Sequence, residues 1–198
     1  MNRKRTRERG FTLLECLVVV GIMGILTTMA VVGTTGTMQN YRANSALDAV
    51  SSQLRVAREI SIAQRRWVQI TIDTVGKTIS YQVLPPVGVN VTEQPGPIIT
   101  VPLPQYTSYV LEPSVPDTPM AFGNTNAVYI ANVSGGPIGM RFTPTGSFTD
   151  STGSNPISGT IFIGIPNQST TARAVTILGS TGRIRPYTYV GGATGWHE

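Results

Sequence analysis

The sequence predicts an α+β protein in which one long N-terminal helix packs on an antiparallel β-sheet domain. Two observations carry this prediction. Up to about residue 66 the apolar residues form one continuous run and then recur at helical spacing, whereas from Trp67 onward they alternate with polar residues. At 198 residues the chain is long enough for one domain with its own core and too short to expect two.

The basic charge of the chain is concentrated at its N-terminal tip. Five of the 15 Lys and Arg residues lie within the first nine positions, and the remainder of the chain, beyond residue 10, carries a net charge of only +1. The sequence pI of 9.7 therefore describes the tip rather than the whole surface. Bulk charge gives no support for nucleic-acid binding by the remainder.

Residues 13–32 form an apolar segment interrupted only by Glu15, Thr27 and Thr28. About 20 apolar residues span a bilayer as a helix, and the preceding basic cluster predicts a cytoplasmic N-terminus with the rest translocated. Three interpretations compete: a cleaved secretory signal, an uncleaved single-pass anchor for a β domain, and a prepilin leader. Glu15 disfavours the first two, because a carboxylate inside an apolar helix costs about 2.5–3.5 kcal/mol on insertion scales.

The stretch Arg9-Gly10-Phe11-Thr12-Leu13-Leu14-Glu15 resembles the class III signal of type IV prepilins. The resemblance implies cleavage between Gly10 and Phe11 by a prepilin peptidase, followed by N-methylation of Phe11. It also implies assembly with other pilin or pseudopilin subunits, in which Glu15 pairs with the N-terminal amine of a neighbour. Such pairing would offset the cost of a charge buried in lipid.

The resemblance further implies a single-pass protein of the bacterial inner membrane. Its N-terminus is expected in the cytoplasm, and its C-terminal domain in the periplasm or in a surface filament. We divide the chain into a leader (1–10), a transmembrane and assembly helix (11–33), an amphipathic helix (34–66) and a β-rich globular pseudopilin domain (67–198).

The helix is expected to have a membrane half and an amphipathic half. Residues 34–40 are weak helix formers and predict a softened helix without a clean break. Beyond them an apolar stripe predicts a face packed on a sheet, and the charged residues off this stripe, among them Arg58, are expected on a solvated face. The stripe consists of Leu47, Val50, Leu54, Ala57 and Ile60.

Alternating patterns predict strands throughout the second part of the chain, and residues 73–77 read as a hairpin turn between the first two. Residues 85–119 hold nine of the 14 prolines and predict a long loop with one or two short edge strands, such as 108–112. Pro186 confines the last strand to an edge or a bulge. The other strands are expected at 67–72, 78–84, 127–131, 138–142, 160–165, 172–178 and 184–190.

The second half resembles the GspH/FimT group of minor pseudopilins and minor pilins. The residues that carry this resemblance are Phe142-Thr-Pro144-Thr-Gly146, Arg173-Ala-Val-Thr-Ile-Leu178 and Gly182-Arg183-Ile184-Arg185. It implies a pilin-like fold and a subunit of a type II secretion pseudopilus or a type IV pilus.

Little in the sequence favours catalysis. The one histidine, His197, is next to the C-terminus, and no Cys/His cluster suits a metal ion. No phosphate loop follows a strand, and the aspartates, such as Asp73 and Asp150, lie in turn-like sequence. We therefore expect neither an enzyme nor a cofactor nor a metal site. The single cysteine, Cys16, excludes an intramolecular disulfide.

The segment Gly182-Arg183-Ile184-Arg185 is the sharpest candidate binding site. Arg183 and Arg185 are two residues apart and share one face of a strand, where two guanidinium groups suit phosphate oxygens. A GRxR motif in some FimT-like pilins is associated with DNA capture, which makes DNA the second candidate partner. The alternatives are a charged strand edge and an ion pair with an acid on a neighbouring strand. Tyr187 and Tyr189 share that face and fit either base stacking or a core.

Overall fold

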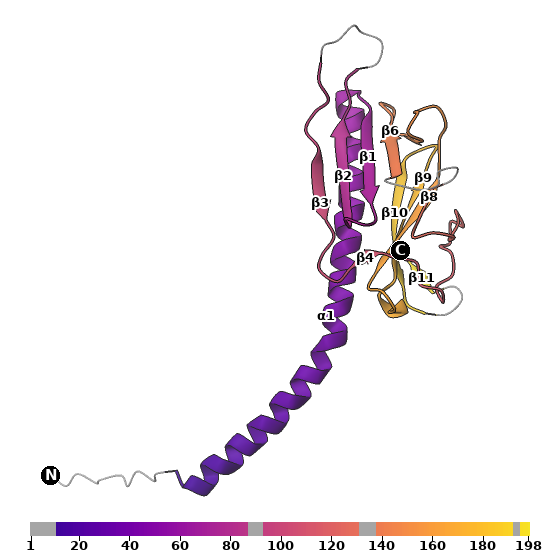
Figure 1. Ribbon diagram of the computed structural model, residues 1–198. Coiled ribbons are helices and arrows are strands. Elements are labelled where there is room, and N and C mark those ends of the chain that lie inside the picture. The colour runs from indigo at the N-terminus through magenta and orange to yellow at the C-terminus, as the bar shows by residue number, and fades with distance from the viewer. Residues whose placement is uncertain (1–10, 87–92, 131–137, 192–194) are drawn as a thin grey trace, which may run out of the picture. The chain divides into compact units, whose positions relative to one another are not determined.

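The computed structural model describes residues 11–86, 93–130, 138–191 and 195–198 (Figure 1). The chain divides into two compact units, Met1–Met38 and Gln39–Glu198. The first unit contains the N-terminal part of a long helix. The second contains the rest of this helix and two antiparallel sheets, so the predicted α+β class is confirmed.

One helix, α1 (Leu13–Gln64), accounts for all the α-helix in the described part of the chain. It continues through residues 34–40 without a clean break, as their sequence predicts. It ends because Arg65 adopts a φ of 52°, in the left-handed region that closes many helices.

The first sheet has five antiparallel strands in the order β3-β2-β1-β6-β7. Its centre is the predicted hairpin, in which Val68 pairs with Val83 and Asp73 with Thr78. The strands are β1 (Val68–Asp73), β2 (Thr78–Val83), β3 (Ile99–Pro102), β6 (Ile138–Phe142) and β7 (Phe148–Thr149).

The second sheet has six antiparallel strands in the order β11-β10-β9-β8-β4, and β5 also pairs with β8. Its centre is β8 and β9, and a short 3-10 turn, η1 (Ser169–Thr171), joins them. The strands are β4 (Ser108–Tyr109), β5 (Val128–Ile130), β8 (Gly159–Gly164), β9 (Arg173–Leu178), β10 (Arg183–Tyr189) and β11 (Trp196–His197).

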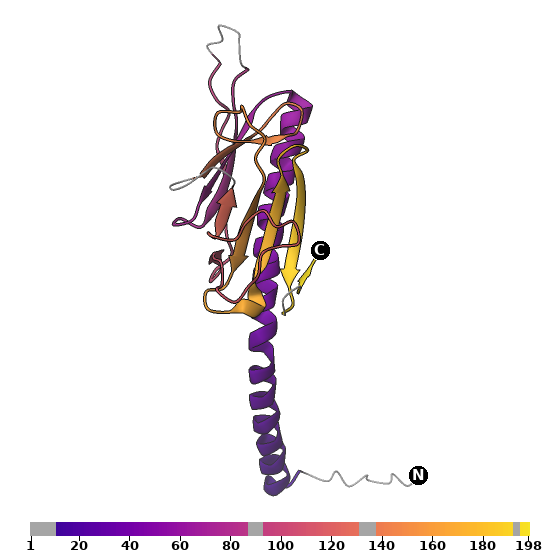
Figure 2. The ribbon, with the colours of Figure 1, turned by 90° about the vertical axis from the view of Figure 1, so that its right-hand side faces the viewer.

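The main core lies between the second half of α1 and the two sheets. Figures 1 and 2 show this part of the helix running along both sheets. The predicted stripe is confirmed, because Leu47, Val50, Leu54 and Ala57 are buried and Ile60 is partly buried against the same cluster. The helix is thus positioned by apolar burial, at roughly 1.5–3 kcal/mol for each large side chain.

The centre of the six-stranded sheet, formed by β8 and β9, is buried on both faces. Along β9, Val175 and Ile177 belong to the main core, whereas Ala174 belongs to a second apolar cluster on the opposite face. Strands buried on both sides read as continuous apolar runs, which explains the composition of β8 and β9. The second cluster comprises Val115, Phe162, Ala172, Ala174, Tyr187, Tyr189 and Trp196.

Most predicted strands are confirmed to within two residues at each end, although Ala131 lies outside the described residues. The proline-rich stretch contains two short edge strands, β3 and β4, as predicted. Pro186 pairs with Val175 on one side and has no β11 partner on the other, so it lies at a local edge. The strands β3, β7 and β11 were not among those predicted individually, because two to four residues give little periodicity.

Candidate functional site

The N-terminal motif is described from Phe11 onward, and Gly10 lies outside the described residues. Phe11 is 74% exposed. Thr12 caps the helix: its Oγ1 accepts a hydrogen bond from the backbone N–H of Glu15 at 3.3 Å, and its carbonyl accepts one from Cys16. The helix therefore starts at Leu13, so that two residues, Phe11 and Thr12, separate it from the expected cleavage position.

Glu15 has a local role that the prediction from sequence missed. Thr12 at the cap and Glu15 three residues later follow the S/T-x-x-E pattern of a capping box, and an acid in the first turn is favoured by the helix dipole. The signal was present in the sequence, since the pattern directly precedes an apolar run. Glu15 is exposed, so its carboxylate is available to a partner outside the chain.

The segment from Phe11 to Met29 is exposed throughout, and its surface is apolar apart from Thr12, Glu15, Thr27 and Thr28. An exposed apolar surface of this length marks a contact with other molecules. Within the described residues, no helix combines the length and the apolar character that a membrane crossing requires. The exposed large side chains are Phe11, Leu13, Leu14, Leu17, Val18, Val19, Val20, Ile22, Met23, Ile25, Leu26 and Met29.

Two turns of the second half, one at Gly146 and one at Thr181 and Gly182, meet at Arg58 of α1. The Arg58 Nε donates to the carbonyl of Gly146 at 3.2 Å, and one terminal nitrogen donates to the carbonyl of Thr181 at 3.0 Å. Arg58 is half-buried, so the prediction that it belongs to a solvated face is wrong. Its guanidinium instead donates hydrogen bonds to the carbonyls of two turns, which lie 88 and 123 residues further along the chain.

The backbone conformation and the close packing around Arg58 require a glycine at position 182. Its φ is +62°, and a Cβ at this position would collide with the carbonyl oxygen of Gly146 and lie 2.9 Å from the Nε of Arg58. Side chains other than glycine are disfavoured on both counts. The glycine of the GRxR segment thus has a packing role that needs no ligand.

Arg183 and Arg185 have different surroundings. Arg183 is exposed, and with Arg55 and Arg58 it lines an open hollow of about 470 Å³. Arg185 is half-buried and forms an ion pair with Glu198, directly after β11, at 3.3 Å. A hydrogen bond with Tyr187 and, less strongly, the charge of Glu198 raise the pKa of Arg185 above its ordinary value. The ion-pair interpretation therefore describes Arg185 and leaves Arg183 available.

Tyr187 and Tyr189 belong to the core. Both are buried, and the Tyr189 ring lies 5.3 Å from that of Trp196 between ring centroids. Trp196 is in turn held by a hydrogen bond from its Nε1 to the carbonyl of Pro116 at 3.0 Å. Neither tyrosine is available to stack on a base.

The aspartates form turns. Asp150 Oδ1 accepts hydrogen bonds from the hydroxyl of Thr152 at 2.6 Å and from the N–H of Gly153 at 2.8 Å, and Asp73 accepts two N–H groups in the β1–β2 turn. These donors, led by the Thr152 hydroxyl, lower the pKa of Asp150. No group of three metal-ligating side chains occurs among the described residues.

A comparison with known protein families supports the motif predicted at the N-terminus. Residues 5–31 match the sequence family described as the prokaryotic N-terminal methylation motif, which confirms the predicted prepilin-type signal and indicates a membrane-associated protein. A search among the curated proteins finds no match.

Two solved structures have a general likeness to the chain. One is the minor pseudopilin EpsH from the Type 2 Secretion System of Vibrio cholerae, with a TM-score of 0.45 and 12% identity over 74% of this chain and 97% of that one. The other is the type IV minor pilin FimU of Pseudomonas aeruginosa strain PAO1, with a TM-score of 0.43 and 16% identity over 78% of this chain and 97% of that one.

Proposed function

We propose that the chain is a minor subunit of a type II secretion pseudopilus or a type IV pilus, an assembly protein and not an enzyme. The observation that carries this proposal is the match of residues 5–31 to the N-terminal methylation motif. A prepilin peptidase cuts between Gly10 and Phe11, and the new N-terminus at Phe11 is methylated. The GspH/FimT group, which the second half resembles, contains subunits of both kinds of filament.

Before assembly the protein is anchored in the bacterial inner membrane by a single pass of residues 11–33. The basic residues of the leader hold the N-terminus in the cytoplasm, and the domain from residue 67 onward lies in the periplasm or in a surface filament. The exposed apolar side chains of residues 11–29 support this proposal, because a lipid bilayer would remove them from water.

Assembly is driven by the same surface. The driving force is close packing against the helices of neighbouring subunits, since the side chains are out of water both in lipid and in the helix bundle. Glu15 fixes the register, because its carboxylate pairs with the N-terminal amine of a neighbouring Phe11. Gly21 and Gly24 allow a neighbouring helix to approach closely, because a Cβ at either position would meet nothing within 4 Å apart from adjacent residues and the nearby helix backbone.

The test uses Glu15→Gln, which keeps the shape of the side chain and one acceptor oxygen while removing its charge. Expressed with the peptidase and the filament machinery, the variant is expected to be cleaved normally but to enter filaments at least tenfold less often. A matched control is Glu59→Gln, which changes an exposed acid on the second half of α1. If wild type and Glu15→Gln enter filaments equally often, the proposed role of Glu15 in assembly is wrong.

A second candidate function is DNA binding, favoured by the position of Arg183 beside Arg55 around one hollow. The guanidinium groups of Arg183 and Arg55 are exposed, and such groups suit phosphate oxygens. Binding by the full chain in detergent is expected to weaken with salt at a log–log slope of about −2, reduced by about one unit in Arg183→Ala or Arg55→Ala. Arg185→Ala is the matched control, because its guanidinium pairs with Glu198. No binding at low salt would exclude this function.

A further inference from the structure

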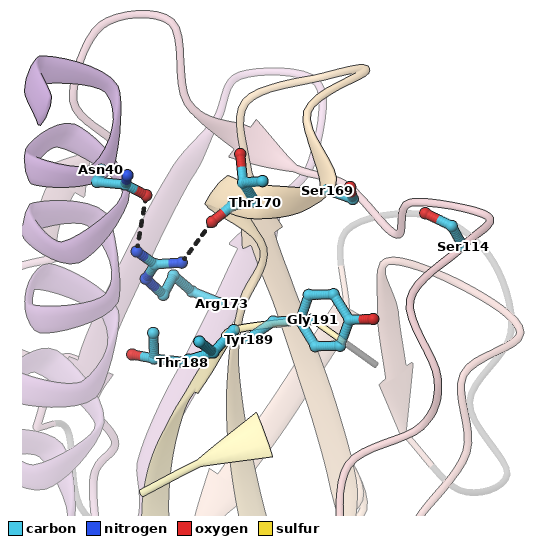
Figure 3. A pocket seen from close by; sticks show the side chains of 9 residues that line it. Asn40, Ser114, Ser169, Thr170, Arg173, Thr188, Tyr189 and Gly191 are labelled. Atoms are coloured by element: carbon cyan, nitrogen blue, oxygen red, sulfur yellow. Dashed lines mark hydrogen bonds between the residues drawn. The ribbon is translucent and has the colours of Figure 1, made fainter. Parts of the chain in front are cut away.

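A second hollow, of about 500 Å³, lies at the end of the six-stranded sheet that faces the residues around Asn40 of α1. Figure 3 shows it between α1, η1 and the end of β10. Its lining combines one buried arginine with hydroxyl groups from three segments. The lining residues are Asn40, Ser114, Ser169, Thr170, Arg173, Thr188, Tyr189, Val190 and Gly191.

Arg173 is the unusual residue of this hollow, because only 3% of its surface is exposed. Its Nε donates to the Oδ1 of Asn44 at 2.7 Å, and a terminal nitrogen donates to the Oδ1 of Asn40 at 3.3 Å. The other terminal nitrogen donates to the carbonyls of Thr170 at 3.3 Å and Ala172 at 2.9 Å. Figure 3 shows the guanidinium pointing between Asn40 and Thr170.

All four acceptors are neutral. No acidic side chain in the described part of the chain forms an ion pair with Arg173, and burial alone lowers the pKa of its guanidinium. Four hydrogen bonds also leave one of the five guanidinium N–H donors unassigned. A buried charge without a counter-ion is costly, and its usual compensation is a partner of opposite charge.

We propose that this hollow binds a phosphate group, with Arg173 as its cationic centre. A tetrahedral phosphate has more acceptor oxygens than a carboxylate, and the hollow offers correspondingly many donors. Ser169, Thr170 and Thr188, which all carry hydroxyl groups, line the hollow together with Arg173, and Ser114 lines it from the opposite side. One cation in a hollow of this size suits a single phosphate rather than the backbone of a nucleic acid, which needs a row of cations.

Two sources supply this chemistry: free inorganic phosphate and the headgroup of an anionic phospholipid. Asn40 follows the apolar segment of residues 13–32 by eight positions along the chain. If the proposed membrane anchor holds, headgroup phosphates are available at this distance along the sequence. The phosphate site itself does not depend on the anchor, so the test has separate arms for the two sources.

Thr188 gives a sharp test, because it is the cross-strand partner of Arg173 in the β9–β10 pairing. Side chains directly opposite on antiparallel strands contact each other on one face. Thr188→Glu places a carboxylate beside the guanidinium, where it takes the position of the ligand. Thr188→Gln is the matched control with the same size and no charge.

The experiment measures thermal unfolding of the full chain in a non-ionic detergent without phosphate. Inorganic phosphate is titrated against chloride at equal ionic strength, and short-chain phosphatidylglycerol is compared with the diacylglycerol that lacks the phosphate. At a hundredfold excess over Kd the midpoint is expected to rise by about 5–10 °C for wild type and Thr188→Gln, and to stay unchanged for Thr188→Glu.

A rise with both phosphate compounds supports a general phosphate site, and a rise with the phospholipid alone assigns the headgroup as the source. Arg173→Lys keeps the charge and is expected to bind at least tenfold more weakly, because it loses the planar donor geometry. The proposal is overturned if neither compound shifts the wild-type midpoint, or if Thr188→Glu responds as strongly as Thr188→Gln. In that case Arg173 only ties α1 to the sheet.

Discussion

Replacing Gly182 by alanine tests whether the glycine of the GRxR segment is required by packing. Two costs add. An alanine at a φ of +62° is disfavoured by about 1–2 kcal/mol. The new Cβ also displaces the Gly146 carbonyl or Arg58, and weakening the two half-exposed hydrogen bonds of Arg58 costs about 0.5–1.5 kcal/mol. The free energy of unfolding is therefore expected to fall by about 1.5–3.5 kcal/mol.

The assay is denaturant unfolding of the full chain in detergent, followed by tryptophan fluorescence. Both tryptophans, Trp67 and Trp196, lie in the unit Gln39–Glu198, so their signal reports on the sheets. The matched control is Arg183→Ala, the next residue, which is exposed and should change stability by less than about 0.5 kcal/mol. Equal stability of Gly182→Ala and wild type would refute the packing role, and Gly182 would then be open to a role in binding.

Three further predictions concern other parts of the fold. Leu54→Ala should lower the free energy of unfolding by about 2–5 kcal/mol in the same assay, because Leu54 is fully buried between α1 and the sheets; unchanged stability would contradict that packing. Thr12→Ala should remove the helix cap, at a cost of about 1 kcal/mol, and speed hydrogen exchange at the Glu15 amide about fivefold; Thr12→Ser should not. The lowered pKa of Asp150 means that its turn contributes stability above its unfolded pKa of about 4 and loses it as the pH falls through the lower folded pKa. Wild type should therefore lose more stability than Asp150→Asn between pH 6 and pH 3, and parallel losses would contradict this role.

The helix and most strands could be predicted because each has a periodic pattern of its own. The stripe from Leu47 to Ala57 has the spacing of one buried helix face, and β1 and β2 alternate on either side of a turn. The strands β3, β7 and β11 are defined by their neighbours instead. For example, β7 contributes only Phe148 and Thr149, which pair with Phe142 and Arg141 of β6.

The candidate sites could be predicted only where the signal is local. The cleavage motif is seven consecutive residues, and the cap formed by Thr12 and Glu15 is readable from its spacing. The roles of Arg58 and Arg173 depend on contacts across 88 or more residues, which no local pattern contains. Likewise, the separation of Arg185 from Arg183 follows from the C-terminal Glu198.

The central claim is that this chain is a processed filament subunit, and the state of its N-terminus tests that claim most directly. The measurement is mass spectrometry of the N-terminal peptide of the protein purified from membranes of a bacterium that expresses a prepilin peptidase. We predict a mature chain that begins with N-methylated Phe11. A chain that retains Met1 through Gly10, or one cut elsewhere, would contradict the account and leave an uncleaved anchor or an ordinary secretory signal.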